Sequence, residues 1–349
     1  MLKRLLDHFR SDLAVDLGTA NTLVSVAGEG LVLDEPSVVA VQKQTRRILS
    51  GGCAVGHLAR QMWGRTPDSI AVVRPLANGT IADFELCEAM LRYFLRKAQP
   101  PGLRLKPRVL VTVPGCATPV EKRAVFNSVL RAGARQVFLV QEALAAAIGA
   151  GLPVAEPTAS AVCDIGGGTT EVAVVSLADV VAGRSVRTGG DQMDQAVVDY
   201  LRRHYSLRIG PAAGERLRID VGSAAPLDEE LTAEVRGLDT ASGVARKATI
   251  TSEEVREALA EPLEAIVEAI AEAVDQCGPD LAADALDNGL VLCGGGSLLR
   301  KIDRFLAERT GLPVRIAPGP LTTVARGALI CLEHLDRWRP ILKSSDEDV

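Results

Sequence analysis

A stretch of apolar residues interrupted by an aspartate, three glycines and two threonines has the clearest potential for chemistry in this sequence. It reads Ala161-Val-Cys-Asp-Ile-Gly-Gly-Gly-Thr-Thr-Glu-Val-Ala-Val-Val-Ser176. The apolar flanks predict two strands, and the glycines allow a turn whose backbone N–H groups approach an anion. Asp164 offers a carboxylate suited to hold a hydrated Mg²⁺, and Thr169 and Thr170 add hydroxyls. The pattern predicts a hairpin that binds phosphate and metal, although glycine-rich hairpins also form for purely structural reasons.

A second copy of this pattern lies near the N-terminus, in Leu13-Ala-Val-Asp-Leu-Gly-Thr-Ala-Asn-Thr-Leu-Val-Ser-Val26. Asp16 again ends an apolar run and is followed by glycine, hydroxyl-bearing residues and a second apolar run. The repetition favours a functional turn over a structural one. It also predicts two matched domain halves, and 349 residues exceed the usual size of a single core.

A third glycine-rich loop, at residues 294–296, joins the apolar run 290–293 to a predicted helix. A loop between strand and helix could hold the pyrophosphate of a dinucleotide. This loop comes late in the chain, however, and the first two loops join hairpins, so a nucleoside clamp fits the context better. No G-x-x-x-x-G-K-[ST] sequence occurs, which excludes a phosphate-binding loop of the Walker type.

The composition argues against a nucleic-acid partner and against secretion. Hydrophobic residues make up 47% of the chain, enough for a packed core, but aromatic residues make up only 3% and the net charge is −5. Base stacking and a basic face are therefore not expected. The seven cysteines are scattered and lack a C-x-x-C pair, which favours free buried thiols in a reducing cytosol. No run of about 18 apolar residues could span a bilayer, and the N-terminus lacks the features of a signal peptide.

Periodicity and turn residues predict the alternating strands and helices of an α/β fold. Strands in residues 30–42 are expected to continue an antiparallel meander after the first hairpin. Ser252 is expected to cap a long helix that reaches about Cys277. The other expected elements are a helical insert at 51–65, helices at 90–98, 119–132, 142–149 and after 189, and strands at 107–114, 136–140 and 232–236.

The first ten residues form a short basic amphipathic segment. Its apolar face comprises Leu2, Leu5, Leu6 and Phe9, and its basic residues are Lys3, Arg4 and Arg10. Two interpretations stay open: the segment packs as a terminal helix on its own domain, or it binds an anionic membrane surface. One copy would bind a membrane weakly, whereas many copies on one assembly would bind well through avidity.

Taken in order, these features resemble the actin, Hsp70 and sugar-kinase superfamily and, within it, the bacterial actins. The resemblance runs from about Met1 to Leu335. It rests on Asp16-Leu-Gly-Thr-Ala-Asn-Thr22, Asp34-Glu-Pro-Ser-Val-Val39, Ala145-Ala-Ala-Ile-Gly-Ala-Gly-Leu-Pro153, Asp164-Ile-Gly-Gly-Gly-Thr-Thr-Glu-Val172 and Gly294-Gly-Gly-Ser-Leu-Leu-Arg300. It implies two RNase H-like domains that face each other across a nucleotide cleft, each with a smaller subdomain, and ATP with Mg²⁺ in that cleft.

The resemblance also implies roles for individual residues. The phosphates would be met from one side by Thr19, Ala20 and Asn21, and from the other by Gly167, Gly168 and Thr169. The metal would be held through water by Asp16 and Asp164. Adenosine and ribose would be enclosed by Glu215, Arg216, Leu217 and Arg218, together with Gly295, Gly296, Ser297 and Leu298. Glu142 falls where the family has the acidic residue that orients the attacking water, helped by Thr169. The family usually reads Glu-Glu-Pro-Met at this point, whereas this chain reads Gln141-Glu-Ala-Leu144, which puts the rate of hydrolysis in doubt.

The implied domain organisation follows the two hairpins. It places the membrane-binding segment at 1–10, subdomain IA at 11–34, 74–146 and 318–342, subdomain IB at 35–73, subdomain IIA at 147–183 and 250–317, subdomain IIB at 184–249, and a disordered tail at 343–349.

The implied function is ATP-dependent polymerisation into membrane-associated cytoskeletal filaments that maintain cell shape by organising peptidoglycan synthesis, with a slow ATPase coupled to assembly. The expected location is cytoplasmic, on the inner face of the cytoplasmic membrane. The expected partners are further copies of the chain in paired filaments, the anionic inner membrane surface and membrane proteins of the cell-wall elongation complex, without nucleic acid. The alternative is a soluble small-molecule kinase on the same fold, which would need an acceptor site of its own. A chaperone-like ATPase is not expected, because it would need a further peptide-binding domain.

Overall fold

The computed structural model describes residues 12–99 and 106–344, and the chain divides into two compact units. Unit 1 comprises Met1–Glu156, Leu177–Asp179 and Thr322–Val349, and unit 2 comprises Pro157–Ser176 and Val180–Leu321. The predicted membrane-binding residues Leu2, Leu5, Leu6 and Phe9 lie outside the described residues.

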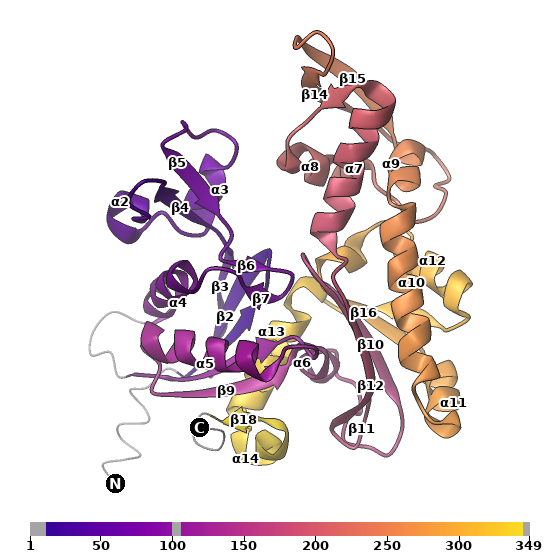
Figure 1. Ribbon diagram of the computed structural model, residues 1–349. Helices are drawn as coiled ribbons and strands as arrows, with labels where there is room; N and C mark the ends of the chain where they lie inside the picture. The colour runs from indigo at the N-terminus through magenta and orange to yellow at the C-terminus, as the bar shows by residue number, and fades with distance from the viewer. Residues whose placement is uncertain (1–11, 100–105, 345–349) are drawn as a thin grey trace. The chain divides into compact units, whose positions relative to one another are not determined.

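Unit 1 is built on a six-stranded sheet with helices packed against it (Figure 1). Its main elements are β1 (Leu13–Leu17), β2 (Asn21–Val26), β3 (Gly30–Pro36), α4 (Phe84–Ala98), β8 (Arg108–Val113), α5 (Pro119–Ala132), β9 (Gln136–Gln141), α6 (Glu142–Gly149), α13 (Thr323–Glu333), α14 (Leu335–Trp338), the 3-10 helix η3 (Arg339–Ile341) and β18 (Lys343–Ser344). The strand order is β18-β9-β8-β1-β2-β3, in which β1, β2 and β3 are antiparallel while β8 and β9 run parallel to β1. Leu13, Val15 and Leu17 face the core formed with α4 and α5, so strand alternation turns Asp16 to the opposite face.

The sequence around the helices of unit 1 explains where they begin. Thr118 and Glu121 form a capping box at α5 with Pro119 in the first turn, and α5 has the predicted bounds. α4 begins six residues earlier than predicted, because the Asp83 side chain accepts a hydrogen bond from Leu86 N (3.2 Å) and caps the helix there.

A smaller group of elements follows β3 in unit 1. It comprises β4 (Val39–Gln42), α2 (Leu49–Gly52), α3 (His57–Met62) and β5 (Ile70–Val73), followed by the hairpin of β6 (Leu76–Ala77) and β7 (Thr80–Ile81). β4 pairs with β5 in a separate two-stranded sheet. The prediction that residues 30–42 continue one meander is therefore wrong: the meander ends at Pro36, where the chain leaves the main sheet.

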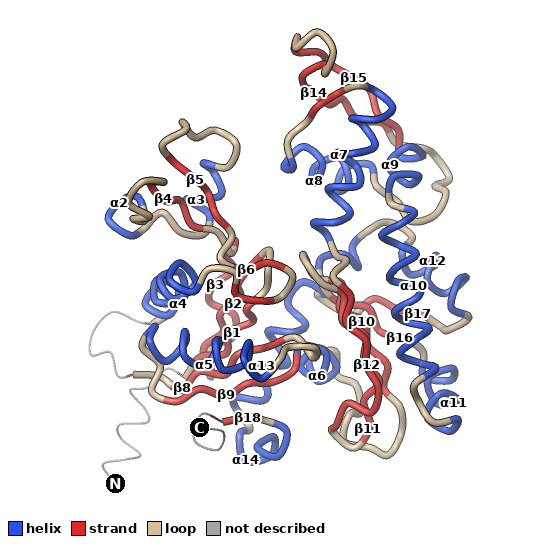
Figure 2. The backbone as a smooth tube through the Cα atoms, viewed as in Figure 1, coloured by secondary structure: helices blue, strands red, loops and turns tan. Residues whose placement is uncertain are grey.

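Unit 2 repeats the topology of the main sheet of unit 1 (Figure 2). Its sheet elements are β10 (Ser160–Ile165), β11 (Thr170–Ser176), β12 (Asp179–Val186), β16 (Leu290–Cys293) and β17 (Val314–Ile316). The order is β12-β11-β10-β16-β17, with β11 antiparallel to β10 and with β16 and β17 parallel to it. This is the same arrangement as β3-β2-β1-β8-β9, which confirms the expected duplication of an RNase H-like core.

The remaining elements of unit 2 cover the sheet and build a smaller subdomain. They are α7 (Gly190–Tyr205), β13 (Leu207–Arg208), α8 (Pro211–Val221), β14 (Thr232–Asp239), β15 (Ala245–Thr251), α9 (Ser252–Ala258), α10 (Ala260–Asp275), α11 (Pro279–Asn288), the 3-10 helix η1 (Gly295–Leu298), α12 (Ile302–Thr310) and the 3-10 helix η2 (Pro320–Thr322). Thr251, and not Ser252 as predicted, caps α9 by accepting a hydrogen bond from Glu254 N, because Thr251 is the last extended residue. The predicted single helix divides into α9 and α10 around Leu259, where Pro262 removes one backbone donor.

Three predicted boundaries move for identifiable reasons. A boundary between residues 146 and 147 would cut α6, which is continuous and packs on α13, so residues 147–156 belong to unit 1. Pro320 O accepts a hydrogen bond from Gly294 N (3.0 Å), and residues 318–321 belong to unit 2. Lys343 and Ser344 are not disordered as predicted, because they pair with Leu139 and Phe138 of β9.

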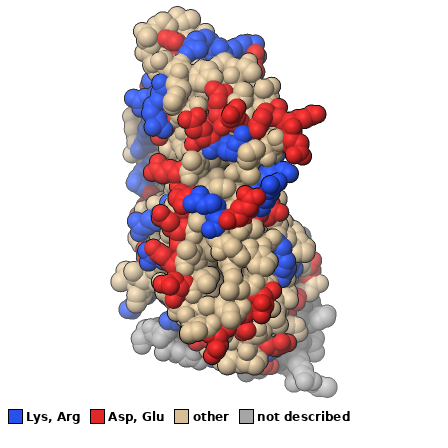
Figure 3. Space-filling model, turned by 90° about the vertical axis from the view of Figure 1, so that its right-hand side faces the viewer, with Lys and Arg blue, Asp and Glu red and all other residues tan. Residues whose placement is uncertain are grey.

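The surface mixes both signs of charge. On the face shown in Figure 3, Lys and Arg lie interspersed with Asp and Glu, so this face presents no extended field of one sign. All seven cysteines are free, but the prediction that they are buried is wrong for Cys53 and Cys116, which are exposed. Within residues 12–99 and 106–344, no helix combines the length and apolar character needed to cross a membrane.

Candidate functional site

The first loop, residues 18–21, connects β1 to β2 at the carboxyl end of β1. The register pairs Leu17 with Thr22, which leaves four residues for the turn. A Cβ at Gly18 would lie 2.7 Å from the carbonyl oxygen of Asn21, so the turn requires glycine there. Asn21 is exposed, and its Nδ2 donates to Asp34 Oδ1 at 2.9 Å. The predicted phosphate-binding residues Thr19, Ala20 and Asn21 thus share one tight turn.

Asp16 precedes the first loop and is held by a residue that sequence reasoning missed. Since Val15 pairs with Val111 in the parallel register, Thr112 lies beside Asp16, and its Oγ1 donates to Asp16 Oδ1 at 2.9 Å. Burial raises the pKa of Asp16 to about 6; the Thr112 hydrogen bond opposes the shift and the charge of Asp34 adds to it. A nearby cation would stabilise the ionised form of a carboxylate in this position.

Thr19 lies inside the first loop, and its side chain is already engaged. The side chain is buried, and its Oγ1 accepts a hydrogen bond from Gly79 N at 2.9 Å. Gly79 stands in the turn between β6 and β7 with a φ of 74°, so that turn reaches the loop through its backbone. The hydroxyl of Thr19 positions the loop, and a ligand would meet the backbone of this residue.

The second loop, residues 166–169, repeats this geometry in unit 2. Ile165 pairs with Thr170, which again leaves four residues, and a Cβ at Gly166 would lie 3.1 Å from Thr169 O. Asp164 is buried and stands directly opposite Glu171, which is also buried and which sequence reasoning missed. Two carboxylates on one face of a hairpin favour a cation nearby.

The third loop, residues 294–296, packs directly on the end of β10, next to the second loop. Gly294 has a φ of 77°, and a Cβ on it would lie 2.4 Å from Asp164 Oδ1 and from Ile165 O. A Cβ on Gly296 would lie 2.1 Å from Ile165 Cγ2. Only glycine permits this close approach. The structure therefore brings the end of β10, the second loop and the third loop together at the carboxyl ends of two parallel strands.

The predicted adenosine-binding residues occupy several environments. Gly295, Leu298 and Arg216 are exposed, Glu215 and Arg218 are half-buried, and Leu217, Gly296 and Ser297 are buried. Leu217 belongs to the hydrophobic core of unit 2, so its side chain packs inside the protein. Ser297 Oγ donates to Gly294 O at 2.7 Å and thus supports the third loop.

Arg218 forms an ion pair that sequence reasoning did not predict. Its Nε lies 2.6 Å from Asp194 Oδ1, with about an eighth of each side chain exposed. Burial raises the pKa of Asp194, while the hydrogen bond and charge of Arg218 oppose the shift. Arg218 Nη2 also lies 3.3 Å from the place where a Cβ of Gly190 would stand. The pair thus ties α8 to the N-terminus of α7.

Glu142 is the first residue of α6 and follows β9 without a loop. It is 8% exposed. The N-terminus of a helix favours a negative charge. Because β8 and β9 run parallel to β1, Glu142 lies at the same edge of the sheet as the first loop.

The side-chain chemistry fits a hydrated metal better than one bound directly by the protein. Among the described residues, no three His, Cys, Asp or Glu side chains gather as metal ligands. Asp16 and Asp164 each stand at the end of a strand beside a glycine loop, where a single carboxylate can hold the waters of Mg²⁺. Each unit therefore has one carboxylate at the end of its first strand, beside a glycine loop.

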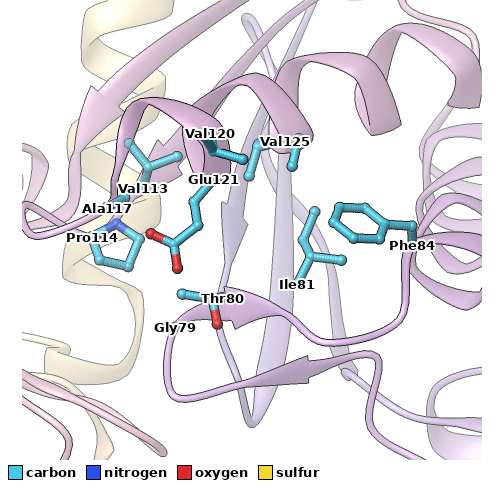
Figure 4. Close-up of a pocket in the computed structure, with 11 residues that line it drawn as sticks. Gly79, Thr80, Ile81, Phe84, Val113, Pro114, Ala117, Val120, Glu121 and Val125 are labelled. Carbon is cyan, nitrogen blue, oxygen red and sulfur yellow. The ribbon is translucent and has the colours of Figure 1, made fainter.

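A separate, mostly apolar pocket lies in unit 1 (Figure 4). The β6–β7 turn, the start of α4, the end of β8 and the start of α5 line it, with Ile81, Phe84 and Val120 on its walls. Its wall includes Gly79, whose N–H holds Thr19, but none of the predicted site residues. The pocket is thus a neighbour of the first loop.

Comparison with known proteins places this chain in a family. The family model described as MreB/Mbl protein matches residues 10–340. Cell shape-determining protein MreB of Escherichia coli (strain K12) is 53% identical over 337 residues, which cover 96% of this chain and 97% of that protein. Cell shape-determining protein Mbl of Bacillus subtilis (strain 168) is 42% identical over 329 residues, which cover 94% and 98%.

A solved structure agrees with this assignment. The crystal structure of MreB5 of Spiroplasma citri bound to AMPPNP superposes with a TM-score of 0.89 at 33% identity, covering 95% of this chain and 98% of that chain. The match confirms the actin-like fold that the sequence motifs imply. On the family model and on relatives matched over nearly their whole length, the chain belongs to the MreB/Mbl family.

Proposed function

We propose that this chain is a bacterial actin that binds ATP with Mg²⁺ and polymerises into filaments that maintain cell shape. The observation that carries the proposal is the duplicated sheet, with an Asp-x-Gly loop after the first strand of each copy. The relatives named as cell shape-determining proteins support it, as do the Spiroplasma citri structures bound to AMPPNP and ADP. They do not favour the alternative, a soluble small-molecule kinase.

In this proposal the loops bind the nucleotide mainly through their backbones. Thr19, Ala20 and Asn21 contact the phosphates from one loop, and Gly167, Gly168 and Thr169 from the other. Residues 215–218 and 295–298 enclose adenosine and ribose; Leu217 takes part through the core packing that positions α8. Asp16 and Asp164 hold the waters of Mg²⁺, which when bound neutralises part of the phosphate charge.

Hydrolysis in this proposal depends on Glu142. Its carboxylate orients the attacking water, and Thr169, also 8% exposed, assists. Phosphoryl transfer asks mainly for positioning and charge stabilisation, so one well-placed carboxylate suffices. Gln141 and Ala143 replace an acid and a proline that the family usually has beside it, and we expect slow turnover coupled to assembly.

Assembly and location complete the proposal. The chain forms paired filaments on the inner face of the cytoplasmic membrane, where many copies of the N-terminal segment bind anionic lipid together. Membrane proteins of the cell-wall elongation complex are the proposed partners, through which the filaments organise peptidoglycan synthesis.

The test is electron microscopy of the full chain with anionic liposomes, with and without ATP and Mg²⁺. We expect filaments on the vesicles only with nucleotide. A chain without residues 1–10 should form filaments that leave the vesicles free. Vesicles without filaments, at concentrations where ATP is demonstrably bound, would contradict the proposal.

The Glu142→Ala variant tests hydrolysis separately. We expect it to bind ATP as the wild type does and to release phosphate at no more than a hundredth of the wild-type rate. Unchanged phosphate release in a steady-state assay would remove Glu142 from this role.

A further inference from the structure

Ser37 occupies the junction between the main sheet of unit 1 and the small subdomain that follows. It stands between β3 and β4 and is completely buried. Its Oγ donates to Gly18 O at 2.7 Å and lies 2.8 Å from Thr22 Oγ1. Its backbone N–H donates to Ala20 O at 2.9 Å. One serine therefore bonds to the first loop at two points, Gly18 and Ala20, and to Thr22 directly after it.

The bond to Gly18 controls the direction of a peptide unit in the loop. A trans peptide is planar, so its C=O and the following N–H point in opposite directions. Anchoring Gly18 O toward Ser37 therefore turns the N–H of Thr19 away from Ser37. Because the single proton of the Ser37 hydroxyl is given to Gly18, Thr22 is the donor in the second bond.

The second loop is held by backbone donors at Gly166, the counterpart of Gly18, and at the next residue, Gly167. Gly166 O accepts from Gly190 N at 3.0 Å, and Gly167 O accepts from Asp191 N at 2.7 Å. The hydroxyl of Thr170, the counterpart of Thr22, donates to Thr188 O at 2.7 Å. Residues 188–191 lead into the small subdomain of unit 2, as Ser37 leads into that of unit 1.

The same peptide geometry applies to the second loop: anchoring the carbonyls of Gly166 and Gly167 fixes the directions of the N–H groups of Gly167 and Gly168. In both units, then, the segment that enters the small subdomain orients the N–H groups assigned to phosphate. The first loop differs in depending on a side chain. One hydrogen-bond partner is enough to satisfy a buried hydroxyl. The Ser37 hydroxyl has two partners: Gly18 O at the start of the turn and Thr22 Oγ1 directly after it.

We propose that Ser37 is a positioning residue for phosphate: it aims the N–H of Thr19 at the nucleotide by anchoring the Gly18 carbonyl. This inference rests on the proposed nucleotide site. Ser37 does not touch the nucleotide and acts through the peptide between Gly18 and Thr19. Its loss should therefore weaken the binding of ligands that carry phosphates and spare a ligand that carries none.

The experiment measures binding of ATP with Mg²⁺ to the full chain by calorimetry and binding of adenosine by ligand-observed NMR. For Ser37→Ala we expect the Kd for ATP to rise about tenfold, as expected for the loss of one orienting hydrogen bond. The Kd for adenosine should stay within threefold of wild type. Thr22→Val is the matched control, because it removes a bond to the same serine without touching Gly18, and it should bind ATP within threefold of wild type.

Three results would overturn the inference. Ser37→Ala binding ATP within threefold of wild type would show that Gly18 is held without the hydroxyl. Equal losses for ATP and adenosine, or for Ser37→Ala and Thr22→Val, would assign Ser37 a structural role only. Failure of the wild type to bind ATP would instead reject the proposed function.

A second variant guards against a folding defect. If Ser37→Ala does not fold, Ser37→Cys keeps nearly the size of the side chain and only a weak S–H donor, and it should raise the Kd for ATP by more than threefold. An unchanged Kd in a folded Ser37→Cys, with adenosine binding also unchanged, would count against the inference.

Discussion

The crossing of α6 and α13 makes a sharp prediction, because two glycines let the helix backbones touch. A Cβ on Gly327 would lie 1.8 Å from Ala145 O, and a Cβ on Gly149 would lie 1.9 Å from Thr323 O. Real Cβ contacts begin at about 3.0 Å, so Gly327→Ala must part the helices by about 1.2 Å. Every residue of α6 is buried, and the whole helix loses packing when it moves.

The expected cost of Gly327→Ala is about 3 kcal/mol in the free energy of unfolding of unit 1. Overpacking costs about 1–3 kcal/mol when side chains can adjust, and here the obstacle is backbone, which no rotamer change relieves. Helix propensity alone predicts the opposite sign, because alanine in a helix is favoured over glycine by about 1 kcal/mol. The sign of the change in the free energy of unfolding therefore distinguishes overpacking from helix propensity.

Guanidinium unfolding followed by tryptophan fluorescence provides the assay. Both tryptophans, Trp63 and Trp338, belong to unit 1, so the signal reports on that unit. Gly149→Ala should cost about as much as Gly327→Ala, and the double variant should cost less than the sum, because the helices part only once. A Gly327→Ala chain as stable as wild type, or more stable, would refute the reasoning.

Two further predictions follow from charged groups. Because burial raises the pKa of Asp16 to about 6 from 3.8, the stability this carboxyl contributes is present at low pH and is lost as the pH rises through 6. Asp16→Asn should therefore raise the free energy of unfolding of the metal-free chain at pH 8, and the gain should be about 1.4 kcal/mol smaller at pH 5. Equal gains at the two pH values, measured by denaturant unfolding, would contradict this. Asp194→Asn leaves the Arg218 guanidinium buried without its carboxylate and should cost about 3 kcal/mol, measured for unit 2 by circular dichroism. Glu308→Gln, which breaks an exposed pair with Arg304, should leave the free energy of unfolding nearly unchanged. Comparable losses for the two variants would show that the Asp194 pair is not effectively buried.

The local pattern of the sequence was sufficient for the two hairpins and for most of the helices. Glycines next to aspartate and hydroxyl residues, flanked by β-branched runs, specify a strand-turn-strand unit through short-range sterics alone. The helix at 119–132 was equally accessible, because its capping box and proline lie within four residues of one another. The family motifs then implied the duplicated core, which the strand orders confirm.

Elements whose pairing depends on residues far away in the chain could not be predicted from the local sequence. Whether a strand continues a meander depends on which edge accepts it, and β4 leaves the main sheet to pair with β5, some 30 residues away. The strand at Lys343–Ser344 exists because β9 offers an edge, and the polar sequence of that region gives no sign of it.

For the candidate site, the sequence by itself determined the residues that form each loop, since a glycine turn is a property of four or five consecutive residues. Only the tertiary structure decided what holds those loops. Thr112 meets Asp16 through the register of parallel strands, and Ser37 meets Gly18 where the chain leaves the sheet. Such contacts join residues far apart in the chain, and strand register and backbone packing bring them together only once the whole sheet has formed.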